Sequence, residues 1–402
     1  MAILRRLRLV ALPAGASLIA ACTLWAGSTA VATEDVEEPV DYEVDVVTDG
    51  LDTPWSLTFL PGQDVDQALV TERPGRLLLV DLASGEARTV SGTPAVAAVG
   101  QGGLLDVVLH PRFADGERWV YLTYSAENEG GSGYATHLGR GRLSDDGAAL
   151  RDFEVLYVAE PFGSNNGHFG SRLVFDDDDR LYMTTGDRRD LDSPQDLRSN
   201  WGKTLRFNAD GSVPDDNPFV DDDDALDAIY TYGHRNSQGM AIHPETGAIW
   251  QNEHGQQDGD EINRIDQPGG NYGWPIATYG VQYGSGTRIG DLPHERDDTV
   301  NPVYYWDGTR YDHGQSGFPP SGLAIYAGAA FPEWEGDLLM GNLRHRYLAR
   351  FEMDGGEVVN EYRLLADRGW RIRDVRVHPD SGDVYVLVDQ ADAPLVRLRP
   401  AG

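Results

Sequence analysis

The chain has 402 residues, of which 40% are hydrophobic, and it carries a formal net charge of −32. This acidity argues against a nucleic-acid-binding protein, which needs a basic face, and against adsorption to anionic lipid. The simplest interpretation of the charge is a highly soluble surface. The length is enough to bury a large core, in one large domain or in two ordinary ones. The 47 glycines, together with short apolar runs, favour an all-β fold.

Residues 1–32 have the pattern of an export signal, because three arginines precede an apolar run at 9–21 that is too short to span a membrane. Two processing sites compete. One lies directly before Cys22, where a bacterial lipoprotein would be lipidated, and the other follows Ala32. Both predict an exported protein, either a cell-envelope lipoprotein or a secreted or periplasmic one. Cys22 is the only cysteine, which excludes an intramolecular disulfide. Without this segment the net charge is −35, since the three arginines are removed with no acids. An acidic linker is predicted at 33–44.

One pattern recurs along the rest of the chain. An alternating apolar run ends in a turn rich in Pro, Asp or Gly, and a second β-rich run follows it. The six copies begin near residues 54, 103, 171, 233, 321 and 373. Such repetition is not expected of a β-sandwich, and it predicts a six-bladed β-propeller of four-stranded antiparallel blades over residues 45–402. Loops from several blades of a propeller can share one site above the central channel, so residues distant in sequence can act together.

Two glycine-rich loops at blade entrances carry polar side chains. Gln101 lies in the segment Gly100-Gln101-Gly102-Gly103, which taken alone is explained as a tight turn with one polar residue. His168 lies among glycines at the start of the third blade. A neutral imidazole at the mouth of a channel can act as a general base. The alternative for His168 is a histidine that hydrogen-bonds to a neighbouring loop.

Charged residues near other strand ends also allow two interpretations. Arg371 and Arg373 flank one residue, so both side chains can point to the same face of an extended segment. They could clamp an anion, because guanidinium groups match carboxylates, or they could pair with neighbouring acids. Glu261, with Asp258 and Asp260, could bind calcium or could form an ordinary acidic turn. The sequence has no Walker loop, dinucleotide fingerprint, nucleophile elbow or zinc-spaced Cys/His set.

Five of these motifs are more specific together than any of them is alone. They stand in a fixed order at residues 100–105, 167–172, 233–239, 260–263 with 270–275, and 371–375. In this order they resemble the soluble quinoprotein glucose dehydrogenase family, and most closely its aldose sugar dehydrogenase branch, over about residues 45–400. The fold of that family is a six-bladed propeller, which agrees with the repeats.

The resemblance implies the cofactor pyrroloquinoline quinone (PQQ), which carries three carboxylates, and calcium. It implies that His168 takes the proton from the anomeric hydroxyl of an aldose, which is oxidised to the lactone while hydride passes to the quinone. Gln101 matches a residue at the substrate and cofactor, and Arg235 and Asn236 match groups beside the quinone oxygens. Arg371 and Arg373 match the cofactor clamp, and Arg344 matches a lysine that contacts the cofactor. A trianionic cofactor on so acidic a protein needs a local cationic cluster, which these arginines can supply.

The resemblance also implies two calcium positions. The backbone carbonyls of Gly255 and Gln256 match the ligands of the calcium that polarises the quinone. Glu261 and Tyr272 match a second, structural calcium site. The expected partners are a small-molecule sugar and an external electron acceptor, with no nucleic acid, and the expected assembly is a monomer or homodimer.

Four positions depart from the glucose dehydrogenase branch. Gly167 stands in place of an Asp, Gln256 of a Pro, Arg188 of a Gln and Arg344 of a Lys. These departures bear on the sugar preference more than on the cofactor. Two other classes of function remain open. A calcium-dependent sugar-lactone hydrolase needs carboxylate and Asn ligands converging on the channel. A non-catalytic binding propeller would be expected to have lost the His and Arg set.

Overall fold

The computed structural model describes residues 38–62, 66–307 and 317–402, so the predicted export segment at 1–32 lies outside the described residues. The regular structure in these ranges is almost all β. Short helical turns occur at Phe113–Glu117, Ser193–Gln195, Pro293–Glu295, Pro332–Trp334 and Ala366–Arg368. In the described part of the chain, no helix is both long and apolar enough to cross a membrane.

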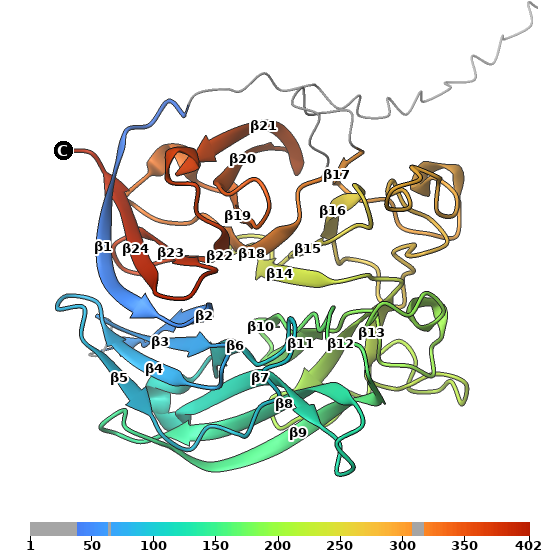
Figure 1. Ribbon diagram of the computed structural model, residues 1–402, viewed down its shortest axis with the longest axis horizontal. Coiled ribbons are helices and arrows are strands. Elements are labelled where there is room, and N and C mark those ends of the chain that lie inside the picture. Colours follow the sequence, from blue (N-terminus) through green and yellow to red (C-terminus); the bar gives the residue numbers. More distant parts are fainter. Residues whose placement is uncertain (1–37, 63–65, 308–316) are drawn as a thin grey trace, which may run out of the picture. The chain divides into compact units, whose positions relative to one another are not determined.

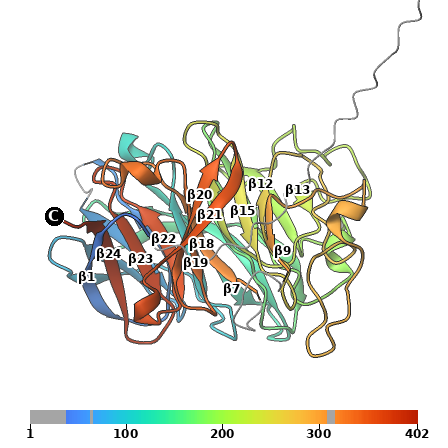
Figure 2. The ribbon, with the colours of Figure 1, turned by 90° about the horizontal axis from the view of Figure 1, so that it is seen from above.

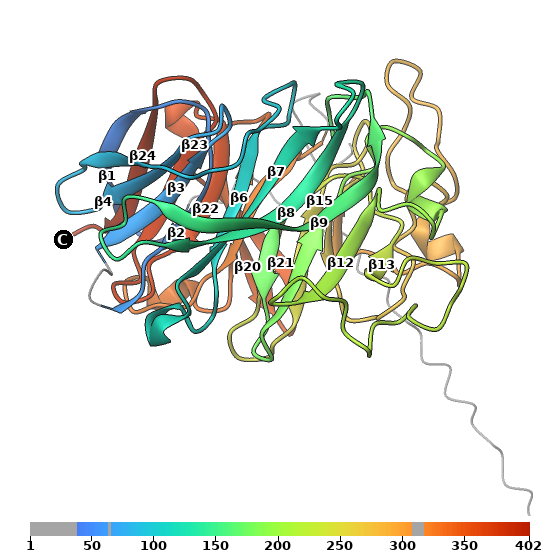
Figure 3. The same ribbon diagram turned by 90° about the horizontal axis from the view of Figure 1, so that it is seen from below.

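The strands form six four-stranded antiparallel sheets arranged as the blades of a propeller, which confirms the predicted architecture (Figure 1). Five sheets follow the order of the chain. They comprise β2 (Pro54–Phe59), β3 (Gln67–Glu72), β4 (Leu77–Asp81) and β5 (Ala87–Val90); β6 (Leu104–Leu109), β7 (Trp119–Glu127), β8 (Tyr134–Leu143) and β9 (Leu150–Gly163); β10 (Leu173–Phe175), β11 (Arg180–Thr184), β12 (Lys203–Asn208) and β13 (Ile229–Tyr232); β14 (Ser237–Ile242), β15 (Ile249–Glu253), β16 (Asp260–Arg264) and β17 (Tyr304–Trp306); β18 (Pro320–Ile325), β19 (Leu338–Asn342), β20 (Leu348–Asp354) and β21 (Glu357–Leu364). Figure 2 shows the twist of the β18–β21 sheet, and Figure 3 shows β9 as the long outer strand of its sheet.

The sixth blade joins the two ends of the propeller. It consists of β22 (Ile372–Val377), β23 (Val384–Val388), β24 (Ala393–Pro400) and β1 (Tyr42–Leu51). The strand β1 pairs antiparallel with β24, with Val44 opposite Leu398, so the blue and red strands lie side by side in Figure 1. Closing the ring in this way covers a strand edge that would otherwise be open to pairing. Because β1 starts at Tyr42, it begins inside the stretch predicted as a linker, before the boundary at residue 45.

Apolar side chains at alternate positions of the strands pack between neighbouring blades. Leu57 and Val70 of the β2–β5 sheet, for example, form one buried cluster with Leu387 and Val388 of β23. Each is fully buried. The period-two alternation in the sequence therefore corresponds to two buried sheet faces, each in contact with the next blade.

The first strands of the six sheets meet around the propeller axis, where a charged cluster is enclosed. Arg172 is fully buried, and its Nη1 lies 2.9 Å from Asp106 Oδ1 and 3.2 Å from Asp374 Oδ1. Its Nε donates to the carbonyl of Gln238 at 2.9 Å. Arg376 also contacts both aspartates. These residues come from four different blades, so the cluster ties the blades together through buried ion pairs.

The histidines before prolines at the blade turns have a structural role. In each of the three turns the imidazole Nδ1 accepts a backbone N–H from two residues further on. The bonds run from Arg112 to His110 at 3.1 Å, from Glu245 to His243 at 3.2 Å and from Asp380 to His378 at 3.3 Å. The side chains therefore cap turns, as Asx and Ser/Thr side chains do elsewhere.

Candidate functional site

The predicted base, His168, lies in the loop between β9 and β10 and is 6% exposed. Its ring Nδ1 lies 2.7 Å from Asp187 Oδ1. Because a carboxylate only accepts hydrogen bonds, Nδ1 carries the proton and Nε2 keeps its lone pair. The structure thus fixes the tautomer in which Nε2 can accept a proton.

Asp187 is itself held in one orientation. It follows β11 and is 1% exposed. Its Oδ1 accepts the backbone N–H of Arg189 at 2.8 Å, and its Oδ2 accepts the indole N–H of Trp274 at 2.9 Å. Trp274 comes from the loop after β16, so loops of two blades combine to orient the imidazole of His168.

The electrostatic surroundings favour a neutral His168. Burial lowers the pKa of His168 below its usual value, and the hydrogen bond to Asp187 offsets this only in part. The positive charge of Arg235 lowers the pKa further. A neutral imidazole with a lone pair on Nε2 is the form that a general base requires.

Gln101 contacts the His168 loop directly. Its side-chain Oε1 accepts the backbone N–H of His168 at 2.7 Å, and its own N–H donates to the carbonyl of Asn166 at 2.8 Å. Gly100 allows this approach, because a Cβ at that position would lie 2.3 Å from the Asn166 carbonyl oxygen and the backbone is left-handed, with φ of 57°. The two glycine-rich loops singled out in the sequence are therefore in contact.

Arg235 and Asn236 lie beside the same loop. The amide Oδ1 of Asn236 accepts the N–H of Gly170 at 3.2 Å. Arg235 is 7% exposed and donates to the carbonyl of His254 at 3.1 Å and to Gln256 Oε1 at 2.6 Å. Within the described residues its Nε has no hydrogen-bond acceptor. Burial lowers the pKa of His254 to about 3, so this neighbour carries no competing charge.

Arg371 and Arg373 point to one carboxylate. Both donate to Oδ2 of Asp389, at 2.8 and 2.9 Å. Arg371 also donates to the carbonyl of Leu343 at 2.6 Å, and Arg373 to Gln238 Oε1 at 2.8 Å. Burial raises the pKa of Asp389, but the two guanidinium groups outweigh this and bring it to about 2. The alternative of pairing with a nearby acid is confirmed, yet one carboxylate faces two arginines and a positive charge remains.

Arg344 stands apart from this pair. It lies in the turn after β19 and is exposed, and its backbone N–H donates to Asn342 Oδ1 at 2.9 Å. The preceding residue, Leu343, provides the carbonyl that Arg371 contacts. Arg344 is thus next to the arginine pair along the chain, with its side chain directed to solvent.

Three of the predicted metal residues line one small cavity of about 10 Å³, which is room for about one water-sized species. These are Gly255, Glu261 and Tyr272. Glu261 lies opposite Glu253 in the register of β15 and β16. Burial and the charge of Glu253 raise the pKa of Glu261 well above its ordinary value. Two facing, buried carboxyl groups of this kind are stabilised either by a shared proton or by a cation.

The backbone around Gly255 is tightly constrained. Its N–H donates to Asp260 Oδ1 at 2.9 Å, and a Cβ there would lie 2.1 Å from the carbonyl oxygen of Asp258. The side chain of Gln256 is already engaged by Arg235. In the described residues no group of three or more His, Cys, Asp or Glu side chains is placed to bind a metal. A calcium here would therefore depend on backbone carbonyls as well as side chains.

Arg188, which stands where the glucose dehydrogenase branch has Gln, serves the His168 loop. It is 3% exposed and donates to the carbonyls of Gly167 and Tyr134, both at 2.9 Å. Its guanidinium lies 3.9 Å from the ring centroid of Phe169. Burial lowers its pKa to about 10, so it stays charged at neutral pH.

Several residues of this site were not assigned a role from the sequence. They are Asp187, Trp274, Asp389, Glu253 and His254. Four of them have only a polar side chain at or just after the end of a strand as their sequence signal, whereas Trp274 stands within the motif at 270–275, which assigned it no role. That signal is shared by many loop residues, so it selects none of them without the fold.

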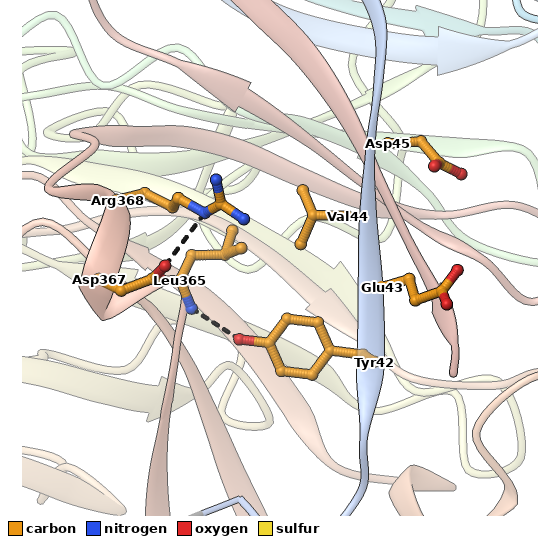
Figure 4. A pocket seen from close by; sticks show the side chains of 7 residues that line it. All are labelled: Tyr42, Glu43, Val44, Asp45, Leu365, Asp367 and Arg368. Carbon is orange, nitrogen blue, oxygen red and sulfur yellow. Dashed lines mark hydrogen bonds and ion pairs between the residues drawn. The ribbon is translucent and has the colours of Figure 1, made fainter. Parts of the chain in front are cut away.

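A separate open hollow of about 490 Å³ lies beside β1 (Figure 4). Tyr42 and Val44 point into it toward Leu365, whereas Glu43 and Asp45 point away on the other side of the strand. The hydroxyl of Tyr42 accepts the N–H of Leu365 at 2.9 Å. None of the predicted site residues lines this hollow.

Comparison with known proteins identifies the class. The family model described as glucose/sorbosone dehydrogenase matches residues 51–397. The chain is 42% identical to aldose sugar dehydrogenase YliI of Escherichia coli over 363 residues, which is 90% of this chain and 94% of the relative. It is 28% identical to quinoprotein glucose dehydrogenase B of Acinetobacter calcoaceticus, over 87% of this chain and 86% of the relative.

Solved structures agree with this result. The soluble aldose sugar dehydrogenase of Escherichia coli in the apo-form superposes with a TM-score of 0.83 at 41% identity, covering 90% of this chain and 100% of that one. The PQQ-bound aldose sugar dehydrogenase of Streptomyces coelicolor superposes with a TM-score of 0.71 at 28% identity, over 90% and 99%. The protein is a propeller enzyme of the sugar dehydrogenase class. It belongs to the glucose/sorbosone dehydrogenase family, as the five motifs predicted.

Proposed function

We propose that the protein oxidises the anomeric hydroxyl of aldose sugars to the lactone, with PQQ as the cofactor and His168 as the general base. The observation that carries this proposal is a neutral, oriented imidazole beside buried arginines: His168, Arg235 and Arg373 all act on His254, and the region around these four residues is called the mouth. The names of the relatives support both the sugar and the quinone.

The residues present fit a trianionic cofactor. Arg371 and Arg373 share a single carboxylate, and Arg235 faces the same mouth. The Nε atoms of Arg235 and Arg373 are buried without a hydrogen-bond acceptor among the described residues. Donors in this condition are costly unless an acceptor arrives, and a carboxylate or quinone oxygen is such an acceptor. PQQ, when bound, would supply the two-electron acceptor that no side chain of the chain can provide.

The remaining chemistry belongs to the protein. His168 Nε2 would accept the proton of the anomeric hydroxyl, and Asp187 would stabilise the imidazolium that results. Gln101 and Arg188 would hold the loop that carries the base. This arrangement needs no movement of the imidazole, since its tautomer and orientation are already set.

We further propose calcium at two positions. The carbonyls of Gly255 and Gln256 would hold one ion, and the cavity lined by Glu261 and Tyr272 would hold the other. Support comes from the facing carboxyl groups of Glu253 and Glu261, whose mutual repulsion a divalent cation would relieve. We also propose that the protein is exported and passes its electrons to an external acceptor.

Reconstitution of the purified protein tests this function. Dye-linked oxidation of aldoses should require added PQQ, and chelation of calcium should abolish it until calcium is restored. Hydrolysis of a sugar lactone by the same preparation serves as the contrasting assay. Sugar oxidation that is equally fast without quinone, or lactone hydrolysis in its place, would refute the proposal.

A further inference from the structure

A third arginine, Arg73, connects the arginine pair to the loop of Gln101. Arg73 follows β3 and is only partly exposed. Its Nη2 donates to the carbonyl of Gly100 at 2.5 Å, and its Nε lies 3.4 Å from the carbonyl of Gly102. The guanidinium therefore contacts the carbonyls of the two residues on either side of Gln101.

The backbone of Arg73 contacts the same loop. Its carbonyl accepts the N–H of Leu104 at 3.0 Å. A Cβ on Gly103 would lie 2.1 Å from that carbonyl oxygen, so only glycine permits this approach. Residues 100–104 are thus held on one side by Arg73.

On the other side the same loop is held by residues of the next blade. Gln101 donates to Asn166 and accepts from the backbone of His168. A continuous set of hydrogen bonds therefore runs from Arg73 through Gln101 to His168. Any displacement of residues 100–104 would alter the position of the base.

Arg73 also lies close to the arginine pair, because its backbone N–H donates to the carbonyl of Thr53 at 3.1 Å and the N–H of Thr53 donates at 3.0 Å to the carbonyl of Gln390, the residue after Asp389. Burial lowers the pKa of Arg73, and the charge of Arg373 lowers it further, while Asp389 acts in the opposite direction. Arg371 adds to the repulsion. Three guanidinium groups thus act on one another with only Asp389 and Asp52 as the carboxylates that offset them, so an anion that binds near all three relieves their mutual repulsion.

We propose that Arg73 is a positioning residue, which links the anion-binding arginines Arg371 and Arg373 to the loop of Gln101 and His168 and contributes a third cation to that cluster. The inference rests on the proposed function, because it takes PQQ as the anion. Arg73 has two properties that can be tested separately. Its positive charge is retained by a lysine, whereas its planar guanidinium group, which donates to two carbonyls at once, is not.

The test compares Arg73→Gln and Arg73→Lys with a control, Arg88→Gln, which removes one exposed arginine from β5 of the same blade. Three quantities are measured: amide hydrogen exchange of the protein without cofactor, the Kd of PQQ, and kcat at saturating PQQ. Thermal unfolding of each variant shows whether it is folded.

Both Arg73 variants should speed amide exchange at residues 101–104 and at His168 by about tenfold or more, since the carbonyl anchors are lost. Arg73→Gln should raise the Kd of PQQ about tenfold, whereas Arg73→Lys should stay within about threefold of the parent because its charge remains. Both should lower kcat about tenfold, because the loop is no longer held. Arg88→Gln should change none of these quantities by more than about twofold.

Unchanged exchange in Arg73→Gln would overturn the positioning role. An equal loss of PQQ affinity in the Lys and Gln variants, accompanied by a large fall in the unfolding temperature, would show a purely structural residue. A parent that binds PQQ without oxidising sugar would refute the proposed function alone, since the exchange and affinity measurements on Arg73 would still stand. If the parent bound no PQQ, the cation role of Arg73 would fall with the proposed function, and exchange would still decide the positioning role.

Discussion

Two of the arginine–aspartate clusters in the described residues, one on the propeller axis and one at the mouth, differ in charge balance. On the axis, Arg172 and Arg376 face Asp106 and Asp374, so two positive charges meet two negative ones. At the mouth, Arg371, Arg373 and Arg73 carry three positive charges, and the carboxylates that act on them are Asp389 and Asp52. The chemistry of the side chains is the same in both clusters.

The balance of charge separates a structural cluster from a binding site. A balanced buried cluster acts on the fold, because each charge has an opposite charge beside it in the protein. An unbalanced one carries an excess of positive charge that the protein does not neutralise nearby, although its total charge is −32. We interpret that local excess, in so acidic a chain, as a place prepared for an anion.

Removal of the axial arginine should have the largest effect on stability. Arg172→Met leaves Asp106 and Asp374 buried with reduced compensation, and the free energy of unfolding should fall by about 3–5 kcal/mol. Denaturant unfolding measures this, with Arg198→Gln, an exposed partner of Asp224, as the control that should cost below about 1 kcal/mol. A loss as small as that of the control would show that the axial cluster does not tie the blades together.

The corresponding change at the mouth should have the opposite character. Arg371→Ala and Arg373→Ala should each weaken PQQ binding by on the order of 1–3 kcal/mol, about 5- to 150-fold in Kd. Their unfolding free energy should change by less than about 1 kcal/mol, since Asp389 keeps one arginine and a repulsion is removed. PQQ titration followed by denaturant unfolding of the same samples measures both. Unchanged titration curves in both variants would contradict the excess-charge account.

The pH profile probes the base beside this mouth. The pKa of His168 is lowered by burial and partly restored by Asp187. The imidazole must be neutral to act as a base, so kcat/KM should rise with pH. The midpoint of the rise should lie below about 6.5, and kcat/KM should be constant at higher pH. Asp187→Asn removes the restoring charge, so the midpoint should move to lower pH, and kcat should fall by on the order of 100-fold because the tautomer is no longer fixed. A midpoint that stays in place would show that another group titrates.

The smallest effect is expected at the hollow beside β1. Tyr42→Phe loses the hydrogen bond to Leu365 and should cost about 0.5–1.5 kcal/mol of unfolding free energy. Sugar oxidation and PQQ affinity should be unchanged, because no site residue lines that hollow. Denaturant unfolding and the dye-linked assay measure the two. A fall in activity would mean that the contrast between the clusters omits a second functional region.

Local patterns were sufficient to predict the blades. Alternating apolar residues and turns rich in Pro and Gly mark the strands, and their repetition gives the number of blades. The closing pair of β1 and β24 was not predicted, because Val44 and Leu398 are brought together only by completing the ring. The early residues of β1 alternate with acids and therefore look like a linker.

The motifs of the site could be predicted from the sequence, but the residues that hydrogen-bond to them could not. His168, Gln101 and Arg373 stand in distinctive short segments, so the sequence could single them out. Asp187 and Trp274 are 87 residues apart and meet only in the fold, where they set the tautomer of His168. The excess of charge at the mouth is likewise a sum over blades, which no single segment reveals. The roles of the predicted residues stay predictions until the variants are measured.

The central claim is that the arginine-rich mouth binds the quinone beside a base, and His168→Gln tests it most directly. Bound PQQ and sugar turnover are measured on one preparation of the parent and of the variant. The variant should bind PQQ and calcium as the parent does, while turnover per bound quinone falls by roughly 100- to 10,000-fold, the usual contribution of a positioned base. Lost PQQ binding or stability, with turnover per bound quinone nearly intact, would contradict the account and would make His168 a structural loop histidine.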